Sequence, residues 1–189
     1  MTAGLLVKVC GITRVVDAEA CGALGVDFCG FVFHPASPRN VNAEEAAKIP
    51  TQGMKRVGVF TTHDVNEILR VMEIARLDYA QLHARQSEAC AEAIGADRVI
   101  RVCFEVPTVE HRAAYLLFDK PFDWRELRGQ KISQPYFIAG GLDAGNIVEA
   151  VSCGTPVGVD LNSGVESAPG KKDAARLRDV LRIIGRNVK

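Results

Sequence analysis

The sequence predicts an α/β fold, a single closed (β/α)8 TIM barrel, on three observations. Eight short apolar runs recur along the chain, rich in Val, Ile, Leu and Phe and mostly without clean two-residue alternation. Such runs are typical of parallel strands covered on both faces. Helical patterns separate most of them, which indicates βαβ units. The first run ends in CGIT and lacks the G-x-G-x-x-G fingerprint of an open nucleotide-binding sheet, so the closed barrel is favoured.

Each expected element has a local reason. The runs that predict strands are residues 5–12, 27–33, 56–60, 78–83, 98–104, 114–119, 135–141 and 156–161. Apolar residues at helical spacing predict helices over residues 14–25, 42–49, 64–75, 86–95, 143–154 and 170–185. Asn42 is the expected N-cap of the second helix, and Gly25 is expected to stop the first. No linker divides the chain, so residues 1–189 are expected to form one domain.

Two connections are shorter than a barrel usually has. Only the segment EVPTVEHRA separates the fifth and sixth runs, barely two helical turns. The sixth run ends at Asp119, and a helix start at Pro121 and Trp124 follows almost at once. We therefore expect a shortened fifth helix region and a shortened loop after strand six.

Composition narrows the classes of function. The 23 basic and 23 acidic residues balance, so no net charge favours nucleic acid or an anionic membrane as partner. The N-terminus has no signal-peptide pattern, and no apolar run approaches the ~18 residues of a membrane span. The six cysteines form no C-x-x-C pair, which predicts reduced, packed thiols, no metal site and a cytoplasmic protein.

Chemistry in such a barrel is expected at the carboxyl ends of the strands. Cys10 follows the first strand beside Gly11; it is either a base, once its thiolate is stabilised, or a packing residue. Asp119 ends an apolar strand, where desolvation disfavours a charged carboxyl group and suits a general acid. The alternative is a helix cap or an ion pair with Lys120. We favour the catalytic interpretation of Asp119.

Two glycine-rich turns predict a phosphate site, because the loops after strands seven and eight hold phosphate in this fold. The first turn contains Gly140 and Gly141. The second, in GVDLNSGVE, contains Asn162, Ser163 and Gly164. Plain turn chemistry is the alternative. Arg39 and His83 are candidates for binding, although each taken alone is more often a surface or structural residue.

Taken together, the motifs KVCGIT, GFVFHPASPRNV, VGVF, QLH, LLFD, FDW, AGGL and GVDLNSGVE occur in order over nearly the whole chain. The chain thereby resembles the phosphoribosylanthranilate isomerases of tryptophan biosynthesis. The resemblance implies an Amadori rearrangement of N-(5-phosphoribosyl)anthranilate to 1-(2-carboxyphenylamino)-1-deoxyribulose 5-phosphate, without cofactor or metal. The implied partner is a phosphorylated small molecule, and the implied assembly is a monomer or a homodimer.

The resemblance also implies a role for each candidate. Asp119 would protonate the furanose ring oxygen, and Cys10 would remove the C2′ proton. Arg39 would hold the anthranilate carboxylate, while Asp160 and His83 would line the substrate pocket. The two glycine-rich turns would hold the phosphate.

The sequence departs from the family pattern at one important place. The family's glycine-rich loop before FDW is missing, and only Lys120 and Pro121 separate Asp119 from that motif. Either the chain is naturally trimmed or residues are absent from the sequence. We favour the second explanation, because both shortfalls lie where flexible loops belong. Milder departures are Ala84 after QLH and DLNSGVE in place of DVSSGVE.

Other interpretations remain open at this stage. A ribulose-phosphate epimerase or indole-glycerol-phosphate synthase relative would need metal ligands or a catalytic lysine at the strand ends. Lys8 instead lies inside the first strand. A weakened binding protein would keep the phosphate turns without the loop beside Asp119, and a structural domain would need none of these residues to converge.

Overall fold

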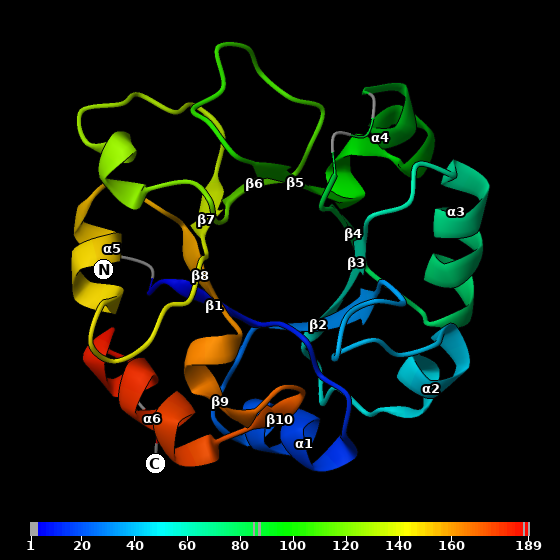
Figure 1. The fold of residues 1–189 in the computed structure, drawn as a ribbon, viewed down its shortest axis with the longest axis horizontal. Helices are drawn as coiled ribbons and strands as arrows, with labels where there is room; N and C mark the ends of the chain where they lie inside the picture. Colours follow the sequence, from blue (N-terminus) through cyan, green and yellow to red (C-terminus); the bar gives the residue numbers. More distant parts are fainter. Residues whose placement is uncertain (1–3, 85, 87, 187, 189) are drawn as a thin grey trace.

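The structure, a computed structural model, describes residues 4–84, 86, 88–186 and 188. Eight parallel strands form a closed barrel in chain order from β1 to β8, and β1 pairs with β8 to close the ring. Helices surround the ring, as Figure 1 shows. The predicted fold class is therefore confirmed.

All eight predicted strands are present, most of them shorter than the apolar runs. They are β1 (Leu6–Val9), β2 (Phe28–Phe33), β3 (Lys55–Phe60), β4 (Tyr79–Leu82), β5 (Val99–Cys103), β6 (Tyr115–Phe118), β7 (Tyr136–Ile138) and β8 (Gly158–Leu161). The longest register joins β2 to β3, from Phe28 opposite Lys55 to Phe33 opposite Phe60. Because the strands stop early, Cys10 and Asp119 lie just beyond the carboxyl ends of β1 and β6.

The outer layer contains six α-helices among the described residues: α1 (Val15–Ala23), α2 (Ala43–Lys48), α3 (Val65–Ile74), α4 (Glu88–Ile94), α5 (Ile147–Ser152) and α6 (Ala174–Ile183). Asn42 caps α2 as predicted, in a capping box with Glu45. Gly25 follows the end of α1 with φ +73°, the left-handed conformation that ends helices. Position 87, inside the expected fourth helix, lies outside the described residues.

Three local expectations need correction. The helix expected after Asp119 is a short 3-10 turn, η2 (Trp124–Leu127), and residues 104–114 between β5 and β6 form no helix. The segment GKKD does not begin the last helix. Lys171–Lys172 instead form β10, which pairs antiparallel with β9 (Glu166–Ala168) in a small hairpin after β8. The origin of the two short connections stays a prediction.

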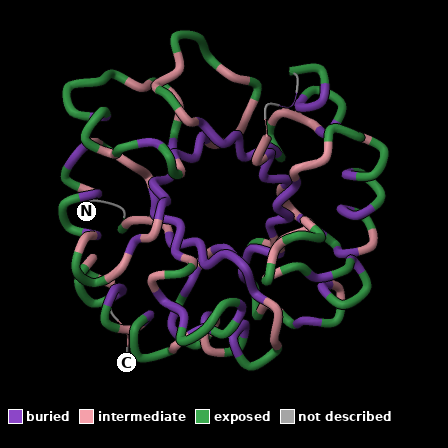
Figure 2. The backbone as a smooth tube through the Cα atoms, viewed as in Figure 1, coloured by how far each residue is buried: buried purple, intermediate pink, exposed green. Residues whose placement is uncertain are grey.

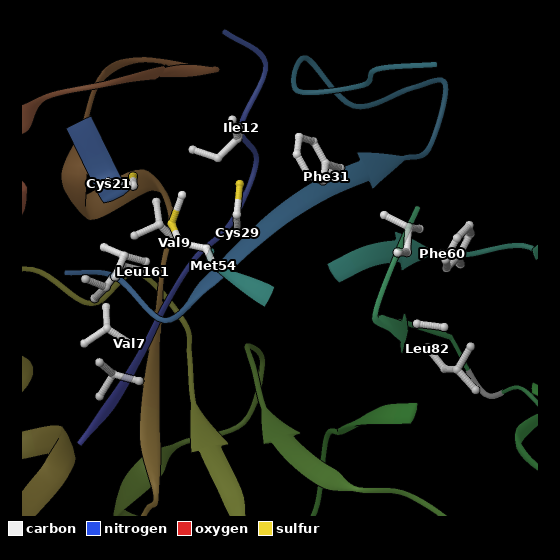
Figure 3. Close-up of a cluster of buried hydrophobic side chains, with 14 of the residues drawn as sticks. Val7, Val9, Ile12, Cys21, Cys29, Phe31, Met54, Phe60, Leu82 and Leu161 are labelled. Atoms are coloured by element: carbon white, nitrogen blue, oxygen red, sulfur yellow. The ribbon is translucent and has the colours of Figure 1, made fainter. Parts of the chain in front are cut away.

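Two apolar cores hold the barrel together. Figure 2 shows the strands as a mostly buried ring inside a largely exposed outer layer. One core packs the outer faces of the strands against the helices. Figure 3 shows part of it, with Val7 and Val9 of β1 near Leu161 of β8. The other core lies inside the barrel and is formed by strand residues that point inward. Two of them are Phe28 and Phe137, whose rings meet edge to face with their centroids 5.5 Å apart.

This alternation explains how polar residues reach the barrel mouth. Val7 and Val9 of β1 face the outer core. Lys8, between them, therefore faces the interior, since successive residues of a strand point to opposite sides. The apolar core inside the barrel therefore closes the bottom of the pocket, and the polar groups lie between that core and the carboxyl ends of the strands.

Candidate active site

A pocket of about 390 Å³ opens at the carboxyl ends of the strands. Its lining contains nearly all the residues that the sequence predicted for the site, and these residues lie on six of the eight strands or in the segments that follow them. They are Cys10, Arg39, His83, Asp119, Gly140, Gly141, Asp160, Asn162 and Ser163. Gly164 is the one predicted residue outside the lining.

Cys10 lies beside a buried ion pair. Lys8 is fully buried, and its Nζ is 2.9 Å from Oδ2 of Asp160. A methyl group built on Gly30 would lie 3.0 Å from Cys10 Sγ and 3.2 Å from Lys8 Nζ, so the thiol and the ammonium flank one small space. Burial raises the pKa of the Cys10 thiol, while the positive charges of Lys8 and Lys172 oppose that rise. The two lysines therefore favour the thiolate that a base requires.

Lys8 keeps its charge in this environment. Burial alone would lower its pKa, but the charges and hydrogen bonds of Asp160 and Cys10 outweigh burial and raise it. A charged lysine in a fully buried position needs such partners, because desolvation of an unpaired ammonium is costly. Asp160 has a second oxygen, Oδ1, without a hydrogen-bond partner among the described residues.

Asp119 is held at the pocket rim and is only partly buried. Its side chain is 27% exposed, so the carboxyl group is less desolvated than the sequence predicted. Oδ1 accepts a hydrogen bond of 2.8 Å from the backbone N–H of Lys120. Oδ2 lies 3.9 Å from Nε2 of His83. His83 is therefore the neighbour of the predicted acid as well as a lining residue.

Arg39 is fixed by a carboxylate before any ligand arrives. Its Nε and Nη2 donate to both oxygens of Glu166, with a shortest distance of 2.6 Å between Nη2 and Oε2. Sequence reasoning quoted Glu166 only as part of a motif and gave it no role. The partners are 127 positions apart, and no local pattern reports such a contact.

The first glycine turn has the conformation expected of a ligand-binding turn. Gly140 and Gly141 both have positive φ, 100° and 74°, which side chains with a Cβ rarely adopt. The ammonium of Lys120 lies over this turn, since a methyl group on Gly141 would be 3.2 Å from Lys120 Nζ. The sequence had suggested Lys120 only as a partner for Asp119. The tight junction after β6 instead places a cation at the predicted phosphate site.

The second turn follows β8 and contains η3 (Ser163–Val165). Asn162 and Ser163 line the pocket. The side-chain oxygen of Asn162 accepts a hydrogen bond of 2.9 Å from Lys172, so this oxygen is already engaged. Gly164 packs against the first turn, and a methyl group there would lie 2.0 Å from the carbonyl oxygen of Leu142. The two turns are therefore in direct contact.

Replacing Gly164 with alanine should destabilise the fold and weaken phosphate binding. The added methyl group overlaps a backbone carbonyl that cannot move alone, and overpacking of this kind costs about 1–3 kcal/mol. Urea denaturation and calorimetric titration with inorganic phosphate measure the two effects. Gly4→Ala is the control, because no atom lies within 4 Å of a methyl group at Gly4. Unchanged phosphate affinity in Gly164→Ala would show that the second turn does not depend on this contact.

Gln81 is a further lining residue that the sequence did not single out. It is buried in β4, and its Nε2 is 3.5 Å from Nδ1 of His83. Two-residue alternation along QLH is the signal that could have found it, because Gln81 and His83 point to the same side. The same rule relates Lys8 to Cys10.

Several expectations concern other parts of the chain. All six cysteine side chains are buried, as predicted. The described residues contain no group of three or more His, Cys, Asp or Glu side chains arranged to hold a metal ion. None of the helices they form has the length and apolar character needed to cross a membrane.

Comparisons with known proteins identify the family. A family model described as N-(5'phosphoribosyl)anthranilate (PRA) isomerase matches residues 7–182. The chain is 42% identical to the N-(5'-phosphoribosyl)anthranilate isomerase of Desulfovibrio desulfuricans over an alignment 200 positions long, which covers 95% of each chain.

Solved structures give the same answer. The dimeric phosphoribosylanthranilate isomerase of Thermotoga maritima, in a form generated as monomers, is 32% identical with a TM-score of 0.82, covering 95% of this chain and 98% of that one. Another phosphoribosyl anthranilate isomerase, in complex with reduced 1-(o-carboxyphenylamino)-1-deoxyribulose 5-phosphate, is 31% identical with a TM-score of 0.83 and the same coverage. The chain belongs to the phosphoribosylanthranilate isomerase family.

Proposed function

We propose that the chain catalyses the Amadori rearrangement of N-(5-phosphoribosyl)anthranilate to 1-(2-carboxyphenylamino)-1-deoxyribulose 5-phosphate, by general acid–base catalysis. One observation carries the proposal. A single pocket brings Cys10 and Asp119 together with Arg39 and the glycine turn at Gly140 and Gly141. An aldose-to-ketose shift on a phosphorylated substrate with a carboxylate needs a base, an acid and one site for each charged end.

Asp119 and Cys10 divide the proton transfers. Asp119, in its protonated form, donates a proton to the furanose ring oxygen, and the C1′–O bond breaks to give a protonated Schiff base. The Cys10 thiolate then removes the proton from C2′, and the electron pair moves into an enolamine. Tautomerisation of the enolamine gives the ketone. Cys10 and Asp119 follow β1 and β6, which β7 and β8 separate around the ring, so the two groups approach the sugar from different sides.

The two charged groups of the substrate, a carboxylate and a phosphate, match two parts of the pocket lining. Arg39 presents a guanidinium, which suits a planar carboxylate. The turns after β7 and β8, together with the Lys120 ammonium, suit a phosphate. His83 and Asp160 line the same pocket and would contact the sugar. Gly164 allows the second turn to pack against Leu142 of the first turn.

Two further points are part of the proposal. The reaction takes place in the cytoplasm, which suits six buried cysteine thiols, and it requires no cofactor. The enzyme is a monomer or a homodimer, and its partner is the phosphorylated small molecule alone. The earlier alternatives, a ribulose-phosphate epimerase or an indole-glycerol-phosphate synthase relative, have less support. Lys8 is paired with Asp160 and is not free to act as a catalytic lysine, and the described residues hold no group of three or more His, Cys, Asp or Glu side chains arranged to bind a metal ion.

The test is an assay of the purified chain with freshly generated N-(5-phosphoribosyl)anthranilate, in which consumption of the fluorescent substrate is followed. We expect turnover without added metal or cofactor, unchanged by a chelator. A chain that binds a phosphorylated product analogue but turns over no substrate would favour the alternative of a binding protein.

A further inference from the structure

The guanidinium of Arg39 has two edges, and only one is occupied. Glu166 accepts hydrogen bonds from Nε at 3.0 and 3.2 Å and from Nη2 at 2.6 Å, which occupies the side edge. No hydrogen bond within the described part of the chain uses Nη1. A guanidinium has five N–H donors, so the end edge, formed by Nη1 and the second N–H of Nη2, remains available in the pocket.

Glu166 is itself fixed by the hairpin after β8. Its side chain is 4% exposed, and that of Lys172 is 2% exposed. The two residues lie opposite each other in the β9–β10 pair, with 2.7 Å between Lys172 Nζ and Glu166 Oε1. The backbone N–H of Gly170 donates to the same oxygen at 3.1 Å. Burial opposes ionisation of Glu166, but the hydrogen bonds from Arg39 and Lys172 outweigh it and lower its pKa.

The charges of this cluster also matter. An arginine paired with one glutamate is neutral overall and offers little attraction to a second carboxylate. Lys172 adds a second cation, so Arg39, Glu166 and Lys172 together carry one net positive charge. A cluster with that charge, buried enough to escape most screening, attracts a monoanion strongly.

We infer that Glu166 is a positioning residue for substrate recognition: it orients the end edge of Arg39 toward the substrate carboxylate, and Lys172 supplies the compensating charge. The inference rests on the proposed function, in which Arg39 binds that carboxylate. Glu166 does not line the pocket, so it would act through Arg39 without touching the substrate. Its contribution is to fix the guanidinium in one orientation before the ligand binds, which lowers the entropy cost of binding.

The hairpin also connects this cluster to the rest of the site. Lys172 donates to the side-chain oxygen of Asn162 at 2.9 Å, and Asn162 belongs to the second glycine turn. Thr13 donates to the carbonyl oxygen of Gly170 at 2.7 Å, which ties the hairpin to the segment after Cys10. Gly11 leaves room for Arg39, since a methyl group there would lie 2.6 Å from Arg39 Cδ.

The experiment compares two probes by calorimetric titration. One is reduced 1-(2-carboxyphenylamino)-1-deoxyribulose 5-phosphate, and the other is the same compound with hydrogen in place of the carboxyl group. The ratio of their dissociation constants isolates recognition of the carboxylate. We expect Lys172→Met, which makes the cluster neutral, to shrink that ratio by about tenfold or more, the equivalent of a lost charge-assisted hydrogen bond. Glu166→Gln should shrink it to a similar degree, because losing the fixed orientation of Arg39 outweighs the positive charge that the cluster gains. In Glu166→Gln, affinity for the probe without the carboxyl group should stay within about twofold, a small free-energy difference on the same scale. In Lys172→Met that affinity should fall as well, because Asn162 of the second glycine turn loses its hydrogen bond, so only the ratio is the readout for this variant.

Asp17→Asn is the matched control. Asp17 accepts hydrogen bonds from Arg14 Nε at 2.9 Å and from Arg14 Nη2 at 2.6 Å, the same two guanidinium atoms that Arg39 uses toward Glu166. Its side chain is also 4% exposed. It lies on α1 and does not line the pocket. A structural role alone would make Glu166→Gln behave like this control, with a lower melting temperature and an unchanged probe ratio. That result would overturn the inference.

Arg39→Ala separates the inference from the proposed function. If the ratio falls in Arg39→Ala but not in Glu166→Gln or Lys172→Met, only the positioning role is wrong. If Arg39→Ala keeps the wild-type ratio, or the wild type binds neither probe, the assignment of Arg39 in the proposed function fails, and the positioning role fails with it.

Discussion

Replacing Asp119 with asparagine is expected to lower kcat by about 10²–10⁴-fold, the usual contribution of one positioned proton donor. Asparagine has nearly the same shape and can still accept the hydrogen bond from the Lys120 backbone N–H. It cannot give a proton to the ring oxygen. Affinity for the reduced product analogue should change little, because the loss concerns the transition state. Steady-state kinetics together with a titration of the analogue measures both quantities.

The control for this variant is Asp123→Asn. Asp123 caps η2, its side chain is 49% exposed, and it does not line the pocket. It should keep wild-type kinetics. Wild-type kcat in Asp119→Asn would contradict the assignment of the acid and would transfer that role to His83, whose Nε2 lies 3.9 Å from the Asp119 carboxylate.

Replacing Cys10 with serine should have an effect of similar size, about 10²–10⁴-fold on kcat. A hydroxyl group loses its proton far less readily than a thiol, so the two lysines near Cys10 cannot make it a base.

The activity of the wild type should also depend on pH. Burial raises the pKa of Cys10, so the thiolate is the minor form at neutral pH, and kcat/KM should increase as the pH rises above 7. Cys10→Ser should lose that increase.

Cys29→Ser provides the comparison for Cys10→Ser. Cys29 is fully buried in β2 and packs in the outer core, away from the pocket lining. It should lower stability, because a hydroxyl group is placed in an apolar environment, and it should leave kcat and the pH profile unchanged. If both variants lose activity to the same degree, the loss comes from the fold and not from a missing base.

Much of the fold could be predicted because the strands are apolar runs of the right length with helical patterns between them. Cys10 and Asp119 could be predicted to lie in one pocket because strand ends meet at one face of a barrel, and that rule needs only the positions of the strands. The hairpin was missed because GKKD precedes a helix and resembles its first turn. Nothing local in two adjacent lysines indicates that Lys172 is buried against Glu166.

Long-range pairs account for the rest of what the sequence did not reveal. Lys8 and Asp160 are 152 positions apart, and Arg39 and Glu166 are 127 apart. Their contact depends on how the ring closes, and one sequence carries no signal of that kind. The position of Lys120 over the first glycine turn likewise depends on the course of the chain after β6. Alternation along β1 and β4 was the unused local signal for Lys8 and Gln81.

The pairing of β1 with β8 has a consequence for how the protein acquires activity. A chain folded only as far as β4 contains Cys10, Arg39 and His83 but lacks Asp119, Asp160 and Glu166. Lys8 and Arg39 would then have no anionic partners, and the thiol would have no fixed surroundings. The site forms only when the last strand and its hairpin join the first. Recovery of turnover during refolding therefore reports closure of the ring, a late event in which the two ends of the chain meet.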